Sequence, residues 1–181
     1  MDMNQLITML KEDEARSRPY RAERLRLLLD QYGHEGIRMF PGGPISFMAF
    51  EESRQAYLHG LFVACTIMCQ VCLEHMLAGL FRQAGRDDLD RATFETLLRE
   101  ALDQRFLSSD EFALFDRLRS LRNPYAHPRA PTGKGSIVRR AVEANIAVED
   151  LIVDDAELAI SALLRLCRRS PFTLSENGDA S

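Results

Sequence analysis

Apolar residues recur at helical spacing along most of this chain, and their pattern predicts its elements. Positions 4–16 predict a short amphipathic helix, and the segment from Pro19 to Gly33 predicts a second one, since proline suits the first turn of a helix and glycine its end. The longest periodic stretch, Phe47 to Gln83, predicts one helix of about 55 Å. Between Leu58 and Phe81 apolar side chains occupy nearly every face, which indicates burial against several neighbours or across a subunit interface.

The second half of the chain predicts four further helices. They are expected from about Thr93 to Arg105, from the capping residues Ser108 to Asp110 as far as Arg122, from Ile137 to Ala144, and from Asp154 onward, where Asp154 and Glu157 have the spacing of a capping box. The pattern therefore predicts an all-α fold, an up-and-down helical bundle with additional N-terminal helices.

Glycines and prolines from His34 to Pro44 predict a loop between the first helices and the bundle. A chain of 181 residues is long enough for one domain with a substantial core. We expect residues 1–45 to pack on the bundle as N-terminal helices and a loop, residues 46–170 to form the bundle, and residues 171–181 to be a disordered tail.

The start of the chain lacks the basic region and apolar core of a secretory signal, so a cytoplasmic protein is expected. A membrane span is the alternative interpretation of the apolar segment from Leu58 to Phe81. Gln70, Glu74 and the charged residues at both ends of that segment argue against it, because a charge within hydrocarbon is costly.

The cysteines predict core packing rather than a metal site. Cys65, Cys69 and Cys72 lie at i, i+4 and i+7 on one apolar helical stripe, and Cys167 stands alone near the end of the chain. Cysteine is among the most buried residue types, and no paired Cys-x2-Cys arrangement is present. We therefore expect neither a metal nor a cofactor.

Charge is distributed unevenly along the chain. The formal net charge is −4, yet the segment from Arg117 to Arg140 contains seven cations and no carboxylate. The seven are Arg117, Arg119, Arg122, Arg129, Lys134, Arg139 and Arg140. A local basic patch can recruit a polyanion even when the whole molecule is acidic, although scattered, solvated arginines would give the same sequence pattern.

The basic segment contains an arginine and a histidine of complementary chemistry. Arg122 is permanently cationic and its guanidinium suits phosphate oxygens, whereas the imidazole of His127 can exchange protons near neutrality. Pro124 is expected to end the preceding helix, with Asn123 capping a short new turn. Such a kink would present Arg122 and His127 together, as in a site for phosphodiester chemistry. The alternative is a helix-terminus cap with a structural arginine.

The hexapeptide from Arg122 to His127, Arg-Asn-Pro-Tyr-Ala-His, resembles the Arg-x4-His signature of HEPN domains, and asparagine directly after the arginine is typical of that family. HEPN domains are small all-α proteins, and many are metal-independent ribonucleases. Arg54 and His59 have the same spacing. They lie inside a predicted helix, where five residues correspond to about 500° and leave the two side chains about 140° apart around the axis.

The resemblance implies an endoribonuclease that cleaves RNA without a metal, by attack of a 2′-hydroxyl on the adjacent phosphate. Arg122, Asn123 and His127 would be its catalytic residues. Arg119, Arg129 and Lys134 would bind the substrate. One histidine cannot readily serve as both base and acid, so a composite site in a homodimer is expected.

A polar stripe of Thr66, Gln70 and Glu74 runs along the apolar helix, and buried polar groups need partners. Gln70 or Glu74 is expected to support the site by contacting Arg122 or His127, unless the stripe simply faces solvent.

Two alternatives to the nuclease remain open from the sequence. One is a non-catalytic HEPN-like module that binds nucleic acid, a nucleotide or a protein partner, and the other is a structural dimerisation protein. A toxin with an antitoxin partner, or a defence protein, is a further possibility within the family. Some HEPN toxins carry His-x-Tyr, whereas this chain has His127-Pro128-Arg129, so modification at such a tyrosine is not expected.

Overall fold

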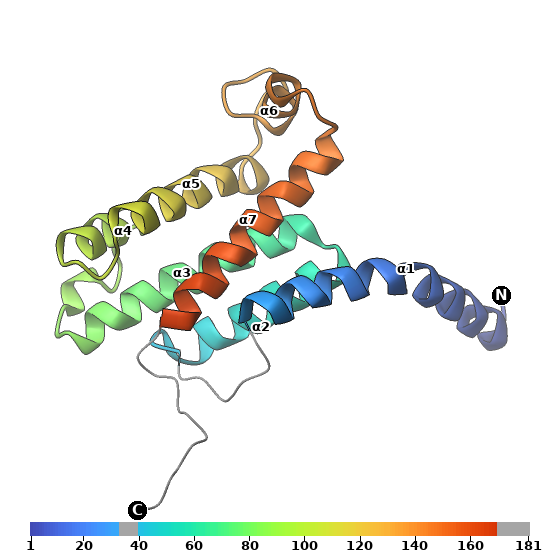
Figure 1. Ribbon diagram of the computed structural model, residues 1–181, viewed down its shortest axis with the longest axis horizontal. Coiled ribbons are helices and arrows are strands. Elements are labelled where there is room, and N and C mark those ends of the chain that lie inside the picture. The colour runs from blue at the N-terminus through green and yellow to red at the C-terminus, as the bar shows by residue number, and fades with distance from the viewer. Residues whose placement is uncertain (33–39, 170–181) are drawn as a thin grey trace, which may run out of the picture.

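A computed structural model describes residues 1–32 and 40–169 of the chain, and these residues form an all-α helical bundle, as the sequence predicts (Figure 1). The described elements, in chain order, are α1 (Met3–Tyr32), α2 (Gly43–His59), α3 (Phe62–Gln83), a short 3-10 helix η1 (Asp87–Leu89), α4 (Phe94–Asp103), α5 (Ser109–Ala126), α6 (Ile137–Ala144) and α7 (Val148–Arg169). The predicted tail 171–181 lies outside the described residues.

The prediction of a single helix from Phe47 to Gln83 is wrong. The chain reverses at Gly60, whose φ of 77° lies in the left-handed region that glycine adopts without strain. The amide N–H of Leu61 bonds to the carbonyl of Ala56 at 2.8 Å and closes the end of α2. The reversal lets the apolar faces of α2 and α3 bury one another, which a single straight helix could not do.

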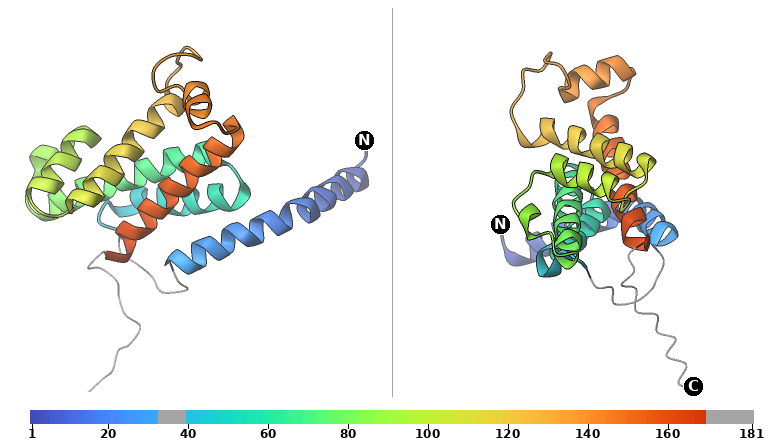
Figure 2. Two further views of the ribbon diagram at one scale, coloured as in Figure 1. Left: turned by 45° about the horizontal axis from the view of Figure 1, so that its top comes forward. Right: turned by 90° about the vertical axis from the view of Figure 1, so that its left-hand side faces the viewer.

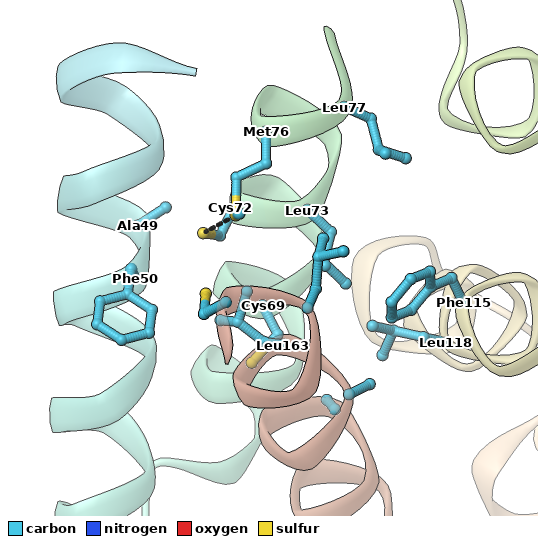
Figure 3. Packing of buried hydrophobic residues seen from close by; sticks show 14 of the residues in the cluster. Ala49, Phe50, Cys69, Cys72, Leu73, Met76, Leu77, Phe115, Leu118 and Leu163 are labelled. Atoms are coloured by element: carbon cyan, nitrogen blue, oxygen red, sulfur yellow. Dashed lines mark hydrogen bonds between the residues drawn. The ribbon is translucent and has the colours of Figure 1, made fainter. Parts of the chain in front are cut away.

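Helix α3 lies at the centre of the bundle, in contact with α2, α4, α5 and α7. Cys65, Cys69 and Cys72 are fully buried along it, which confirms the predicted core stripe. Burial raises the pKa of the Cys69 and Cys72 thiols, so both are protonated near neutrality. Figure 3 shows buried side chains of α3 packed among residues of α2, α5 and α7.

By length and composition α3 is the one described helix that could cross a membrane. Half of its most apolar window is buried inside the bundle, as in the central helix of a packed core. The buried half of that window packs against the neighbouring helices of the bundle.

The start of α2 lies directly against α3. A Cβ atom added to Gly79 would lie 2.1 Å from the carbonyl oxygen of Pro41, and one added to Gly42 would lie 2.4 Å from the carbonyl oxygen of His75. Only glycine permits so close a backbone approach. The predicted loop ends earlier than expected, because Gly43 and Pro44 already belong to α2, and its residues 33–39 lie outside the described part.

Helix α1 continues through Pro19, so the prediction of two separate N-terminal helices is wrong. Ala15 and Pro19 are both exposed, so water can satisfy the carbonyl of Ala15 that proline leaves without a donor. Its C-terminal half packs against α2 and α7 and buries Leu28. Its N-terminal half extends beyond the bundle (Figures 1 and 2).

The helix starts and ends of the second half follow local capping rules. Ser108 and Glu111 form a reciprocal capping box at the start of α5, and α6 has the predicted bounds. The final helix begins at Val148 rather than at Asp154, which is a correction. Glu157 cannot serve as the expected capping partner, because it lies inside α7 and accepts a hydrogen bond from the Tyr57 hydroxyl at 3.1 Å.

Candidate active site

Helix α5 carries the arginine and histidine motif, and it does not end at Pro124. It continues to Ala126, so the predicted break with a new turn capped by Asn123 is wrong. Pro124 removes one N–H, but the carbonyl it leaves without a donor, that of Ser120, is on an exposed residue and can be hydrated. The helix instead ends at His127, whose φ of −132° and ψ of 133° are extended.

Arg122 and His127 differ in their surroundings. Arg122 is half-buried and lies four residues after the fully buried Leu118, on the side of α5 that turns toward the core. His127 is exposed at the end of the helix. Within the described part of the chain, neither side chain makes a hydrogen bond or an ion pair. Asn123, between them, is half-buried. The end of α5 therefore holds a guanidinium and an imidazole without a hydrogen-bond or ion-pair partner among residues 1–32 and 40–169.

A buried polar cluster fixes this end of α5 to the rest of the fold. The hydroxyl of Tyr125, inside the motif, donates to Asp155 Oδ2 of α7 at 2.7 Å. Arg140 of α6 donates two hydrogen bonds to the same carboxylate, at 2.7 and 2.6 Å. The Asp155 side chain is 4% exposed, and burial together with this carboxylate raises the pKa of Tyr125. One carboxylate thus joins α5, α6 and α7.

Sequence reasoning missed Asp155. A signal for it exists, since Asp155 lies on the same helical stripe as Leu151, Ala159 and Ala162, where an apolar residue would be expected. A carboxylate on a buried stripe needs a cationic or hydroxyl partner. The partners are 15 and 30 residues away in sequence, so the pattern does not identify them.

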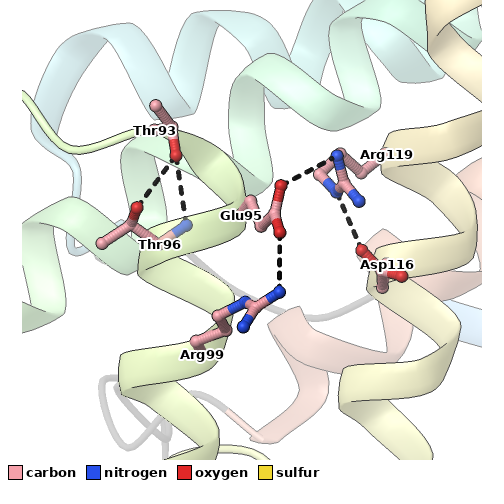
Figure 4. A network of polar contacts seen from close by, with 6 residues as sticks. All are labelled: Thr93, Glu95, Thr96, Arg99, Asp116 and Arg119. Carbon is pink, nitrogen blue, oxygen red and sulfur yellow. Dashed lines mark hydrogen bonds and ion pairs between the residues drawn. The ribbon is translucent and has the colours of Figure 1, made fainter.

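Arg119, predicted to bind substrate, is held by carboxylates. Its guanidinium lies 2.8 Å from Asp116 in the preceding turn and 3.4 Å from Glu95 of α4, as Figure 4 shows. Arg139 pairs with Glu143 in the same way, at 2.7 Å. The carboxylates that pair with these arginines lie outside the segment from Arg117 to Arg140. They neutralise part of its positive charge, which a charge count of the segment alone does not reveal.

Four cations of the basic segment have no carboxylate partner among the described residues. They are Arg117, Arg122, Arg129 and Lys134. Arg129 donates to the carbonyl of Lys134 at 3.0 Å, and Ser136 donates to the carbonyl of Pro131, so the loop after His127 folds back on itself. Both Arg129 and Lys134 are exposed on this loop. They remain the best-placed residues of the predicted set to meet a polyanion.

The predicted supporting residues make no hydrogen bond or ion pair with the motif in the described part of the chain. Gln70 is buried, with 6% of its surface exposed, and its Oε1 atom has no protein donor. Glu74 is half-exposed, and Thr66 is buried with its hydroxyl bonded to the carbonyl of Phe62 at 3.1 Å. The stripe is therefore not a solvent-facing strip.

A hollow of about 600 Å³ lies beside the Asp155 cluster, between α1, α5, α6 and α7. Arg117, Arg140 and Asp154 line it, together with Asp155, whereas Arg122 and His127 do not. The two motif side chains thus do not share this hollow. They lie at the end of α5.

The second Arg-x4-His match, in α2, is engaged elsewhere. Arg54 bonds to Glu51 at 3.0 Å, and its guanidinium lies over the rings of Phe50 and Tyr32. An arginine held by a carboxylate and two rings is structural. Pairing thus separates the two matches. Helix geometry does not, because α5 continues from Arg122 to Ala126 and the kink that was expected to present Arg122 and His127 together is absent.

Within residues 1–32 and 40–169, no three side chains of His, Cys, Asp or Glu group as ligands for a metal ion. Comparison with protein-family models, with curated proteins and with solved structures found no match to this chain. The function must therefore be argued from the chemistry of these residues.

Proposed function

We propose that this chain is a metal-independent endoribonuclease of HEPN type, with Arg122, Asn123 and His127 as its catalytic residues. One observation carries the proposal: Arg122 is a half-buried guanidinium without a carboxylate partner among the described residues, followed five residues later by an exposed imidazole at the helix end. Arg119, Arg139 and Arg140 of the same segment are all paired. A cation without a described carboxylate partner, near the same helix end as a proton-exchanging group, suits an anionic substrate.

The reaction follows from these groups. A base removes the proton of a ribose 2′-hydroxyl, the oxygen attacks the adjacent phosphorus, and the bond from phosphorus to the 5′ oxygen breaks as an acid protonates that oxygen. The products are a 2′,3′-cyclic phosphate and a 5′-hydroxyl. Arg122 stabilises the negative charge that develops on the phosphorane. Asn123 helps to hold the site, while Arg129 and Lys134 contact flanking phosphates.

Two proton transfers require two groups, and the end of α5 offers only His127. We therefore propose that two copies of the chain pair so that each contributes its His127 to a composite site. In a twofold-symmetric pair the same patch of both copies meets itself, which places two equivalent histidines about one axis.

The composite site is tested by titrating the inactive His127→Ala variant into a fixed amount of wild-type protein that is cleaving labelled RNA in excess chelator. If both His127 side chains are needed, a pair with one variant copy is inactive. The activity of the wild-type protein should therefore fall in proportion to the fraction of its partners that are still wild type. An inert protein at equal concentration should not lower it. Unchanged activity, with exchange verified by native mass spectrometry against a tagged copy of the variant, would mean that each copy works alone. Dependence of cleavage on a divalent metal would contradict the proposal as a whole.

A second candidate is a non-catalytic module that binds RNA or a protein partner. It is favoured by the commitment of Tyr125, inside the motif, to the buried Asp155 cluster, because that contact gives the motif a structural role. This candidate predicts RNA binding that weakens in Arg122→Ala, with no cleavage by the wild-type chain.

A further inference from the structure

Gln70 is the polar group of the core whose burial the fold leaves unexplained. The residue is 6% exposed, yet its Oε1 acceptor has no hydrogen-bond donor among the residues that the structure describes. An acceptor buried in this way loses its hydration without gaining a hydrogen bond, which destabilises the folded state. Native structures hold few such atoms, and each one calls for a reason.

The helix faces bring Gln70 toward Arg122. On α3, Leu73 and Leu77 point to Phe115 and Leu118 of α5 (Figure 3). Gln70 precedes Leu73 by three residues and Leu77 by seven, so it lies on the same face of α3. Helices α3 and α5 run in opposite directions (Figure 1). Arg122, which follows Leu118 by one turn, therefore lies toward Gln70.

Contacts with α7 place the end of α5 and the start of α3 at the same height in the bundle. Phe62, at the start of α3, lines one hollow together with Val153 and Glu157 of α7. Tyr125, near the end of α5, bonds to Asp155 of the same helix. The end of α5 and the start of α3 thus meet the same part of α7, and Gln70 lies two turns after Phe62.

We propose that Gln70 is a positioning residue for Arg122. When a phosphate occupies the site, the side-chain carbonyl of Gln70 accepts a hydrogen bond from the Arg122 guanidinium. The other N–H groups of the guanidinium then point at the phosphate. Arginine has five N–H donors and no acceptor, so it can serve both partners at once. In this arrangement the Oε1 atom of Gln70 and the guanidinium of Arg122 become partners for each other. This inference rests on the proposed role of Arg122 as a phosphate-binding group.

The test is Gln70→Met, which keeps the length of the side chain and removes its acceptor. Because the lost atom has no protein partner, Tm should rise by about 2–4 °C. Cleavage should nonetheless fall by about 10–100-fold in kcat/KM, the range for a hydrogen bond to a charged group. In an Arg122→Ala background the same substitution should cause no further loss, since the partner is absent. Thr66→Val, one turn away and equally buried, is the matched control and should leave kcat/KM unchanged.

Two outcomes would overturn the inference. A Tm that falls in Gln70→Met would show that the amide is held by a structural hydrogen bond, and unchanged kcat/KM beside a sensitive Arg122→Ala would show that Arg122 needs no positioning. If no cleavage occurs, the affinity for a 2′-deoxy oligonucleotide decides. Loss of affinity in both Arg122→Ala and Gln70→Met would support the pairing while the nuclease proposal fails, and loss in neither would end both.

Discussion

The His127→Ala variant is expected to cleave RNA about 10²–10⁴-fold more slowly than the wild-type chain, the usual contribution of a positioned acid or base. Its Tm should not change, because His127 is exposed and its side chain makes no hydrogen bond within the described residues. Rates of cleavage of a labelled RNA in excess chelator, measured beside thermal unfolding, check both parts.

The chain contains a matched control for this variant. His59 ends the second Arg-x4-His match and is also exposed, so His59→Ala makes the same chemical change at a site with no proposed role. It should cleave at the wild-type rate. Equal loss in both variants, or equal activity of His127→Ala and the wild type, would contradict the assignment of His127.

The Asp155→Ala variant is expected to lose about 3–5 kcal/mol of unfolding free energy, the usual result of removing one partner from a buried ion pair. The change leaves the Tyr125 hydroxyl without its acceptor and the Arg140 guanidinium without its carboxylate. Because the Arg140 side chain is 20% exposed and can reach water, the loss should lie near the lower end of that range. Urea unfolding followed by circular dichroism measures it.

Asp154 provides the comparison for Asp155. It is the preceding residue on α7 but is exposed and makes no ion pair in the described part of the chain, so Asp154→Ala should change the unfolding free energy by less than about 0.5 kcal/mol. A similar small loss in Asp155→Ala would mean that the cluster does not fix the end of α5. The proposed geometry of the motif would then lose its support.

The features that the sequence predicted correctly are local. The cysteine stripe, the cap at Ser108 and the bounds of α6 each depend on residues within one or two turns. Spacing and capping chemistry act at that range, so the linear pattern contains the necessary information.

The prolines were misjudged for one shared reason. Pro19 and Pro124 were expected to start or stop helices, yet both lie inside them. The cost of an interior proline depends on whether water can reach the carbonyl that loses its donor. Solvent exposure is a property of the folded bundle, and the spacing of residues does not reveal it.

The sequence predicted the candidate site only in part. It did not predict the ion pairs that residues distant in sequence form around the site. The motif residues lie at one helix end, but Arg119 is neutralised by Glu95, which comes from another helix. Asp155 and Arg140 were not foreseen as a pair, because their contact depends on how α6 returns against α7. Interactions between distant residues require the fold to be known first.

The chemical ends left by cleavage distinguish attack by the 2′-hydroxyl from other routes of RNA cleavage. Wild-type protein should cut RNA in excess chelator to leave a 2′,3′-cyclic phosphate and a 5′-hydroxyl, and a substrate with 2′-deoxyribose at the cleaved position should remain intact. End-group analysis by mass spectrometry distinguishes these products. Cleavage of the 2′-deoxy position, or products bearing a 5′-phosphate, would contradict the proposed attack by the 2′-hydroxyl and the roles given to Arg122 and His127.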